Sequence, residues 1–341
     1  MKGINFMMKK LLATAVLATM AATAHAQTSI YGLVDAYVGK NGGTVVDAGG
    51  MSTSYIGIRS SEDLGGGVKA TAVLEQFLRP DTAQQGRFNG DTNWARNAYV
   101  GLSNKAGEVQ VGRVTTPHFV STILFNPFVD SFTFSPIVKN RFGTANYDLA
   151  GGGVDTGWNN SVLAKTSMGG LSLTGVYSAG ITSDAASSSG SAHSLGAMYF
   201  SGPLALTAVM QDVKMAGRAD LKSSLFGASY DLKKVKGFVQ LLKVENSDAR
   251  TREDSGYQYG VSIPMGVGTA MASYSKTEST FVDNRTADQA RWAVGYSHAL
   301  SKRTDVYSAL SKVNYSNDGV NRTNAAFADA KVYGVGVRHR F

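Results

Sequence analysis

The chain has 341 residues, of which 33 are basic and 25 are acidic, so its formal net charge is +8. It contains no cysteine, which excludes disulfides, thiol nucleophiles, zinc–thiolate sites and iron–sulfur clusters. Its mean hydropathy is −0.09, and no apolar run of about 18 residues follows residue 26, so membrane-spanning helices are not expected. The basic residues are spread along the chain and form no cluster, which argues against a nucleic-acid partner.

Residues 1–26 have the pattern of a secretory signal peptide. Three lysines precede a short apolar stretch, and Ala-His-Ala at 24–26 has the form of a cleavage site. We therefore expect the mature chain to begin at Gln27 and residues 27–341 to form a single domain. Removal of the segment takes away three of the 33 basic residues and none of the 25 acidic ones, which leaves a net charge of +5.

Beyond Gln27 the dominant pattern is an alternation of apolar and polar residues with a period of two. In one clear run, Trp292, Val294 and Tyr296 alternate with small or polar neighbours. Such alternation predicts strands with one apolar and one polar face. Runs of this kind predict sixteen strands, near 28–38, 52–62, 68–78, 93–103, 108–116, 158–166, 171–180, 192–201, 204–214, 223–232, 237–246, 256–265, 268–278, 289–300, 304–315 and 330–341.

The number, length and spacing of these runs favour an all-β fold, a closed antiparallel β-barrel in a membrane. The strand number is even, and runs of about ten residues suit tilted strands that cross a bilayer. Short turns alternate with long polar loops, as expected if all the loops lie on one rim. A soluble β-sandwich also has alternating strands, but its strands are shorter, about 5–6 residues.

The third long connection, residues 117–157, differs from the other loops in its apolar content. It carries Phe125, Phe128 and Phe134 among other aromatics, which an exposed loop would leave as an apolar patch. We expect this loop to fold inward and narrow the bore of the barrel. A partner-binding surface loop or a small external domain is the alternative.

The last strand ends on Phe341, with an apolar face at Tyr333, Val335 and Val337 and a small or basic face between them. A closed barrel needs this strand, because an open edge would leave unpaired backbone groups in hydrocarbon. Phe341 is therefore predicted to take part in barrel closure and assembly.

Seven segments carry a family resemblance: IYGLVDA at 30–36, SEDLGGGVKA at 61–70, RNAYVGL at 96–102, VGR at 111–113, WNNSV at 158–162, LSKRT at 300–304 and RHRF at 338–341. In this order they resemble the Gram-negative general porins, especially the trimeric porins of betaproteobacteria. The resemblance implies a homotrimer of 16-stranded barrels in the outer membrane, which lets small hydrophilic solutes and ions diffuse passively without a cofactor or a reaction. It also implies contact with outer-membrane lipid or lipopolysaccharide, and recognition of the C-terminal strand by the barrel-assembly machinery.

Three arginines are predicted to line the wall of the constriction. Arg59 shares its phase with Tyr55, opposite two isoleucines, and Arg113 closes the fifth strand. Arg96 corresponds to a wall arginine of the family that the chain resembles, although it shares its phase with apolar Val100. The chain departs from the family at Tyr55, and again at Trp158, where the family usually has basic residues.

Four residues of the long loop are predicted to face this wall: Asp130, Lys139, Arg141 and Asp148. Opposed acidic and basic rows would create a transverse field in the narrow part of a pore. The alternative is a structural role, in which Asp130 and Asp148 accept hydrogen bonds from backbone amides and only hold the shape of the loop.

Together these features predict an outer-membrane channel with a weak preference for anions. A substrate-specific channel for small anions such as phosphate or carboxylates is the main alternative, which the basic Lys139 and Arg141 keep open. An outer-membrane enzyme would need a nucleophile with a base in reach, and no motif of that kind or metal-binding spacing is present. An adhesin would need longer loops.

Overall fold

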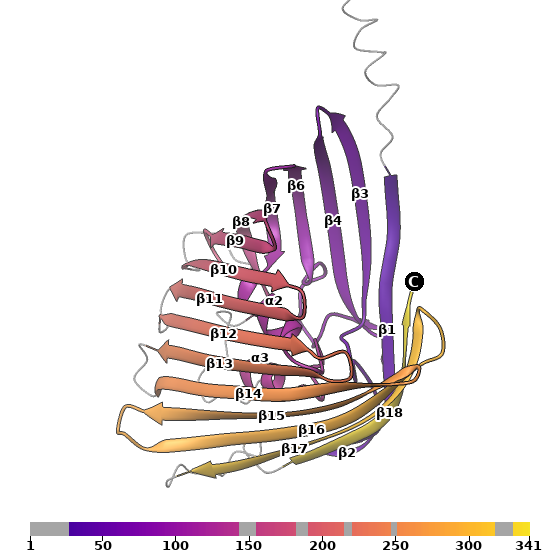
Figure 1. Ribbon diagram of the computed structural model, residues 1–341, viewed down its shortest axis with the longest axis vertical. Helices are drawn as coiled ribbons and strands as arrows, with labels where there is room; N and C mark the ends of the chain where they lie inside the picture. The colour runs from indigo at the N-terminus through magenta and orange to yellow at the C-terminus, as the bar shows by residue number, and fades with distance from the viewer. Residues whose placement is uncertain (1–26, 143–154, 182–189, 215–219, 247–250, 318–329) are drawn as a thin grey trace, which may run out of the picture.

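The polypeptide forms one antiparallel sheet that curves until its first and last strands meet (Figure 1). This computed structural model describes residues 27–142, 155–181, 190–214, 220–246, 251–317 and 330–341. Its strands are β1 (Gln27–Asn41), β2 (Gly43–Ala48), β3 (Tyr55–Gly65), β4 (Val68–Arg79), β5 (Gln84–Gln85), β6 (Asn97–Asn104), β7 (Gly107–Thr115), β8 (Gly157–Met168), β9 (Leu171–Ser178), β10 (Ser191–Ser201), β11 (Leu204–Lys214), β12 (Leu221–Asp231), β13 (Lys236–Asn246), β14 (Thr251–Met265), β15 (Gly268–Phe281), β16 (Thr286–Ala299), β17 (Thr304–Asn317) and β18 (Ala330–Arg340).

Sixteen of these strands form the wall of a closed barrel, as predicted. The other two, β2 and β5, are short strands that pair with the ends of β1 and β4 inside loops. Every predicted strand is present, with ends that differ by a few residues. The predicted strand near 93–103 begins only at Asn97, because the chain bends at Arg96.

Pairing between β1 and β18 closes the barrel. The register runs from Leu33 opposite Arg340 to Asn41 opposite Val332. Phe341 continues the ladder, since its N–H donates to the carbonyl of Gly32 at 3.1 Å and its carbonyl accepts from the N–H of Gly32 at 3.2 Å. The described strands therefore leave no open edge at this seam, as a sheet in hydrocarbon requires.

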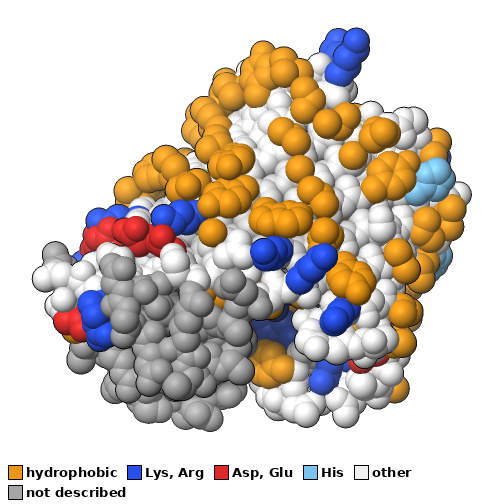
Figure 2. Space-filling model, turned by 90° about the horizontal axis from the view of Figure 1, so that it is seen from below, with side chains coloured by type: hydrophobic (Ala, Val, Ile, Leu, Met, Phe, Trp, Pro, Cys, Tyr) orange, Lys and Arg blue, Asp and Glu red, His pale blue; other side chains and the backbone are white. Residues whose placement is uncertain are grey.

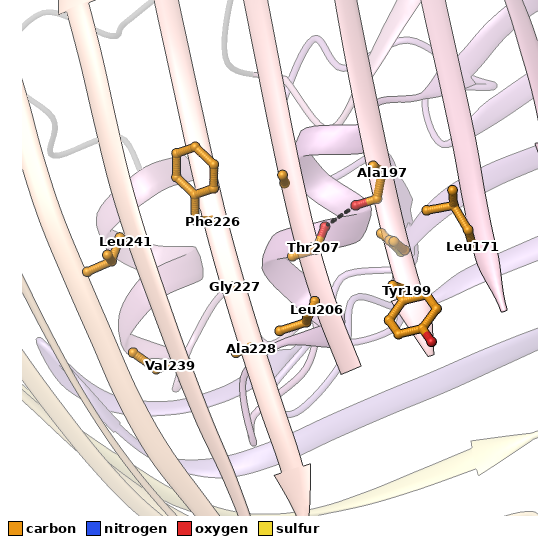
Figure 3. Close-up of a pocket in the computed structure, with 12 residues that line it drawn as sticks. Leu171, Ala197, Tyr199, Leu206, Thr207, Phe226, Gly227, Ala228, Val239 and Leu241 are labelled. Carbon is orange, nitrogen blue, oxygen red and sulfur yellow. Dashed lines mark hydrogen bonds between the residues drawn. The ribbon is translucent and has the colours of Figure 1, made fainter. Parts of the chain in front are cut away.

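The alternation of side chains gives the wall an apolar outer face. On β11 and β12, Met210 is 65% exposed and Phe226 is 49% exposed, whereas their neighbours Val209 and Leu225 are 1% and 0% exposed. Figure 3 shows apolar side chains such as Leu206, Phe226 and Leu241 on one side of these strands, with the loop helices behind them. An exposed apolar band of this kind is what lipid contact requires.

The inner face of the same strands is also buried, because the third long loop covers it from within. The third long loop forms two short helices, α2 (Pro117–Leu124) and α3 (Pro136–Phe142), inside the wall (Figure 1). The Thr116 hydroxyl begins α2 by accepting a hydrogen bond from the Phe119 N–H at 3.2 Å, as an N-cap does. The prediction that this loop folds inward is confirmed. No described helix is long and apolar enough to cross a bilayer.

Candidate functional site

The inward loop is fixed to the barrel wall by close contacts at small residues. Gly227 on β12 leaves no room for a larger side chain, since a Cβ there would lie 3.2 Å from Phe125 and 2.9 Å from Thr207. A Cβ at Gly260 on β14 would lie 2.8 Å from the Pro127 ring. These glycines allow the loop to lie directly on the sheet, which places it across the bore.

Polar groups of the wall complete the attachment of the loop. The Gln240 side chain on β13 donates to the carbonyls of Thr122 at 3.1 Å and Phe125 at 2.9 Å. These are carbonyls at the C-terminal end of α2, which lack partners within a helix. The hydroxyls of Ser121 and Thr207 are hydrogen-bonded at 2.8 Å. The loop is therefore held by both packing and satisfied backbone groups.

Arg141 and Asn140 attach α3 in the same way. Arg141 is 2% exposed and donates to the Ser223 hydroxyl on β12 at 3.1 Å. Arg291 on β16 donates to the Asn140 side chain at 3.2 Å. Burial lowers the pKa of Arg141 to about 10. The structure thus places Arg141 between the loop and the wall, away from open water.

The first loop also folds inward and meets the tip of the third loop, a contact that was not expected from the sequence. The Ser131 hydroxyl donates to the Gly50 carbonyl at 2.6 Å, and the Thr133 hydroxyl donates to the Gly49 carbonyl at 3.0 Å. The Ser52 hydroxyl donates to the Asp130 carboxylate at 2.9 Å. The narrow part of the bore is therefore built from two loops.

A buried carboxylate on β1 holds the first loop in this position. Asp35 is 0% exposed and accepts hydrogen bonds from the backbone N–H groups of Gly50, Met51 and Ser52 at 3.1, 2.9 and 2.8 Å. The Tyr307 hydroxyl on β17 donates to the same carboxylate at 2.5 Å. Charge-assisted hydrogen bonds of this type are the stronger ones, so Asp35 determines the path of residues 49–54.

Basic side chains face Asp130 from the wall. Arg338 on β18 donates to the Ser52 hydroxyl at 2.8 Å and binds the Asp305 carboxylate with two nitrogens, each at 3.1 Å. Arg340, two residues further on the same face, also donates to Asp305 at 3.2 Å. Burial raises the pKa of Asp130 above its usual value, and the Ser52 hydrogen bond and the nearby Arg338 oppose this shift.

Arg96 lies on the inner side of the wall, although its phase in the sequence is that of outward residues. The bend before β6 breaks the alternation and turns the side chain inward. Its guanidinium pairs with the Glu75 carboxylate and lies 3.9 Å above the centre of the Tyr55 ring. Tyr55 occupies a position where the resembled family usually has a basic residue, and here its ring packs against the basic side chain of Arg96.

Arg59 and Lys139 are two further cations that were predicted from the sequence. Arg59 is exposed on β3, in phase with inward Tyr55 and Gly57. Lys139 on α3 is half-buried, and burial together with Arg291 lowers its pKa to about 8.

Arg113 lies at the base of the third loop, where it is 8% exposed. It pairs with Asp155 at 2.5 Å, and Arg87 of the second loop pairs with the other oxygen of the same carboxylate at 2.5 Å. Burial raises the pKa of Asp155, but the two arginines lower it more, so the net pKa lies below the usual value. Asp148, the remaining predicted loop residue, lies outside the described residues.

Arg338, Arg340 and Asp305 were not predicted from the sequence as residues of the constriction. The two arginines lie on the small or basic face of the last strand, so the period-two pattern already placed them inside the barrel. Asp305 gives no such signal, because its role depends on a neighbouring strand. Among the residues that the structure describes, no group of three or more His, Cys, Asp or Glu could hold a metal ion.

Comparison with known proteins agrees with this architecture. The sequence profile of the Gram-negative porin family matches residues 13–319. The outer membrane porin protein 32 of Delftia acidovorans is 32% identical over 326 residues, which cover 89% of each chain. The structure of an anion-selective porin from Comamonas acidovorans superposes with a TM-score of 0.74 at 26% identity, over 93% of this chain and all of the other. A trimer form of OmpT from Vibrio cholerae superposes with a TM-score of 0.68 at 13% identity, over 93% of this chain and 99% of the other.

Proposed function

The chain belongs to the Gram-negative porin family and is therefore an integral outer-membrane channel protein for passive diffusion. On this premise we propose that its channel weakly prefers anions and is otherwise non-specific. The single observation that supports this preference is the charge on the wall opposite the third loop. Arg338 and Arg340 share one carboxylate, Asp305. Arg59, which is exposed on β3, adds a further positive charge on the inner wall.

Asp130 makes the preference weak. Its carboxylate lies close to Arg338, because the Ser52 hydroxyl donates to Asp130 and accepts from Arg338. The negative charge of Asp130 therefore offsets part of the positive charge of the arginines. The pairing of Arg96 with Glu75 removes a further positive charge from the net balance.

The porin of Comamonas acidovorans, described as anion-selective, supports the same sign of selectivity. The reversal potential of purified protein in a planar bilayer with a salt gradient tests it. We expect a modest anion preference at about 0.1 M salt that fades toward 1 M, since the Debye length falls from about 10 Å to about 3 Å. A cation preference at low salt would contradict the proposal.

A dedicated channel for phosphate or carboxylates is the second candidate, and the position of Arg141 disfavours it. That side chain, one of the two basic residues that motivated this candidate, is 2% exposed and bound to Ser223. Liposome swelling distinguishes the two functions. A general porin admits neutral sugars and small anions at rates set by size, whereas a dedicated channel favours the anions strongly.

We also propose that the chain catalyses no reaction, in line with its relatives, which are channels. His118 is 1% exposed, and the ring nitrogens of His298 and His339 contact Tyr296 and Thr304 at 3.3 and 2.9 Å. None of these contacts is the pairing of a base with a nucleophile in a cleft.

Processing and assembly follow from the same premise. We propose that residues 1–26 are removed as a signal peptide, and that three copies associate as the trimer form of the Vibrio cholerae protein does. We further propose that the barrel-assembly machinery recognises Phe341, which pairs with Gly32 where β18 meets β1.

A further inference from the structure

A buried arginine on the inner face of the wall has no carboxylate partner in the described part of the chain. Arg291 on β16 is 4% exposed, and its Nε donates to the Asn140 side chain of α3 at 3.2 Å. An amide oxygen does not neutralise a guanidinium, which has five N–H donors and no acceptor. Buried charges are normally paired, because it is costly to take an ion out of water. The charge of Arg291 is thus left without compensation by the described residues.

A second cation lies beside Arg291, on the loop side of the same contact. Lys139 precedes Asn140 in α3 and is half-buried. Burial, and then the positive charge of Arg291, lower the pKa of Lys139 to about 8. A nearby like charge disfavours the charged form of a group, so the two side chains repel each other. Helix α3 therefore meets the wall at a point where both surfaces are positive.

The carboxylates near this contact bind other groups. Asp47 of β2, whose charge acts on the lysine, accepts a hydrogen bond from the Tyr37 hydroxyl at 3.2 Å. Asp288, three residues from the arginine on β16, has the opposite phase and pairs with Lys276 at 2.8 Å. Figure 2 shows other Lys and Arg side chains at the surface, along one border of a hydrophobic field, where water can hydrate them. Water does not reach the buried arginine in this way, so its need for an anion is greater.

Two buried hydroxyls beside Arg291 also lack a partner. In the register of the sheet, Arg291 is opposite Ser275 on β15 and Val313 on β17. Thr277 and Ser311 each lie two residues from one of these, so they are diagonal neighbours of the arginine, at about 7–8 Å. Both hydroxyls are buried and make no hydrogen bond to any described residue, whereas buried polar groups are normally satisfied. The contact thus offers N–H and O–H donors without a free carboxylate, as an anion site does.

We propose that a small inorganic anion, chloride or an oxyanion such as phosphate, resides between α3 and the wall, where Arg291 and Lys139 bind it with the hydroxyl of Thr277 or Ser311. The anion converts a repulsive contact into an attractive one and completes the attachment of the third loop. Because Arg291 is buried against α3, this ion is a structural part of the protein and not a solute in transit. Its presence is therefore independent of the ion preference of the open bore.

The test measures the thermal unfolding of the protein, purified in neutral detergent, in three sodium salts. Chloride, phosphate and gluconate are compared at equal ionic strength and neutral pH, so that screening is the same in each salt. Gluconate is the reference, because it is too large for a buried contact between a helix and a sheet. R291M and K139M each remove one cation from the site and keep a long side chain. K302M, in an exposed turn, is the control with the same change of charge.

We expect the native protein to unfold about 5 °C higher than in gluconate when the resident anion is present at about a hundredfold its dissociation constant. The salt with the larger rise, chloride or phosphate, identifies that anion, and K302M should keep the rise. R291M should lose it, and in gluconate R291M should unfold at the native temperature or above, because a buried charge without a partner is gone. K139M should show a smaller rise, and its half-buried position makes it the reserve variant if R291M does not fold.

Crystals grown in sodium bromide locate a halide directly, because bromide replaces chloride and scatters anomalously. For a chloride site we expect a peak between Arg291 and Lys139 that is absent in R291M. Equal unfolding temperatures of the native protein in all three salts would overturn the proposal, as would a native salt effect in R291M. Bromide peaks at the exposed surface alone, without a phosphate effect, would indicate an adventitious ion only and would also overturn it. An equal loss of stability of R291M in every salt would show that the chain itself neutralises Arg291, which excludes a resident anion.

Discussion

The two sides of the bore are built on different principles. Along β10 to β16, helices α2 and α3 cover the wall with apolar side chains and satisfied hydrogen bonds, and glycines such as Gly227 let them lie close. Along β1, β17 and β18, the first loop is held on the wall by polar side chains such as Asp35, and Arg338 and Arg340 line this side. The first side determines the width of the channel, and the second determines which charge passes. Width and selectivity can therefore be altered separately.

The largest expected effect is at the base of the loop, where Asp155 joins the second and third loops. Asp155→Ala leaves Arg113 buried without its carboxylate, and loss of one partner of a buried pair costs about 3–5 kcal/mol. Urea unfolding in lipid vesicles measures the loss. The exposed pair of Asp283 and Arg285 provides the control, and Asp283→Ala should leave the unfolding curve unchanged. A similar loss in both variants would contradict a special role for this site.

Gly227→Val tests the side of the bore where the third loop packs on the wall. The added side chain collides with Phe125 and Thr207, and such overpacking costs about 1–3 kcal/mol. We expect the loop to move off the wall and the single-channel conductance to change, with ion preference nearly unchanged. Gly175→Ala is the matched control, because a Cβ at Gly175 has no atom within 4 Å. Native conductance in Gly227→Val would show that the contact does not position the loop.

Arg59→Gln tests the charged side alone. Removal of a unit charge about 8 Å from a passing ion in water changes its energy by about 0.5 kcal/mol, which is about a twofold change in preference. Reversal potentials at low salt should move toward cations while conductance at high salt stays the same. Lys233→Gln, in an exposed turn, is the control with the same change of charge. An equal shift in both variants would mean that only net charge matters.

Asp130 gives the selectivity a dependence on pH. Because burial raises its pKa, this carboxylate becomes neutral at a higher pH than an ordinary aspartate as the solution is acidified. The anion preference should therefore increase between pH 7 and pH 4 or so, near the ordinary range of carboxyl titration. In Asp130→Asn the preference should already be higher at pH 7, and this step should be missing. A step of native size in that variant would exclude Asp130 as its source.

Lys139 should produce the smallest effect, in the opposite pH range. Its pKa of about 8 means that it loses its positive charge as the pH rises through that value. The anion preference should fall slightly between pH 7 and pH 9, and Lys139→Met should abolish that fall. Reversal potentials between pH 7 and pH 9 measure this change in ion preference.

Lys139 also affects stability, because its neutral form is favoured in the folded protein. The native protein should therefore become relatively more stable as pH rises from 8 toward the ordinary lysine pKa.

The strands were predictable from the sequence because the period of two survives in every run that crosses the membrane. The inward third loop was predictable because residues such as Phe128 would otherwise be exposed. The inward first loop was not, because residues 49–54, apart from Met51, are small or polar and show no period. Its position depends on Asp35, and nothing in the sequence near Asp35 indicates that residues 50–52 and Tyr307 surround it.

The charged wall was predictable only in part, for a reason that concerns strand geometry. Phase predicts that Arg59 faces inward, and it could have predicted the same for Arg338 and Arg340. It failed at Arg96, where a bend interrupts the alternation and turns the side chain inward. It also could not distinguish Arg141, which is buried against Ser223, from a residue that faces water. Contacts between elements far apart in the sequence decide these cases.

The anchoring of the first loop has a consequence for biogenesis. Tyr307 and Arg338, which hold Asp35 and Ser52, belong to the final hairpin, β17 and β18. A partly inserted chain lacks Tyr307 and Arg338, so the constriction cannot take its final shape until the last hairpin pairs with the sheet. Barrel closure and formation of the constriction are thus one event. An intermediate without the last hairpin should form a wider pore with little ion preference.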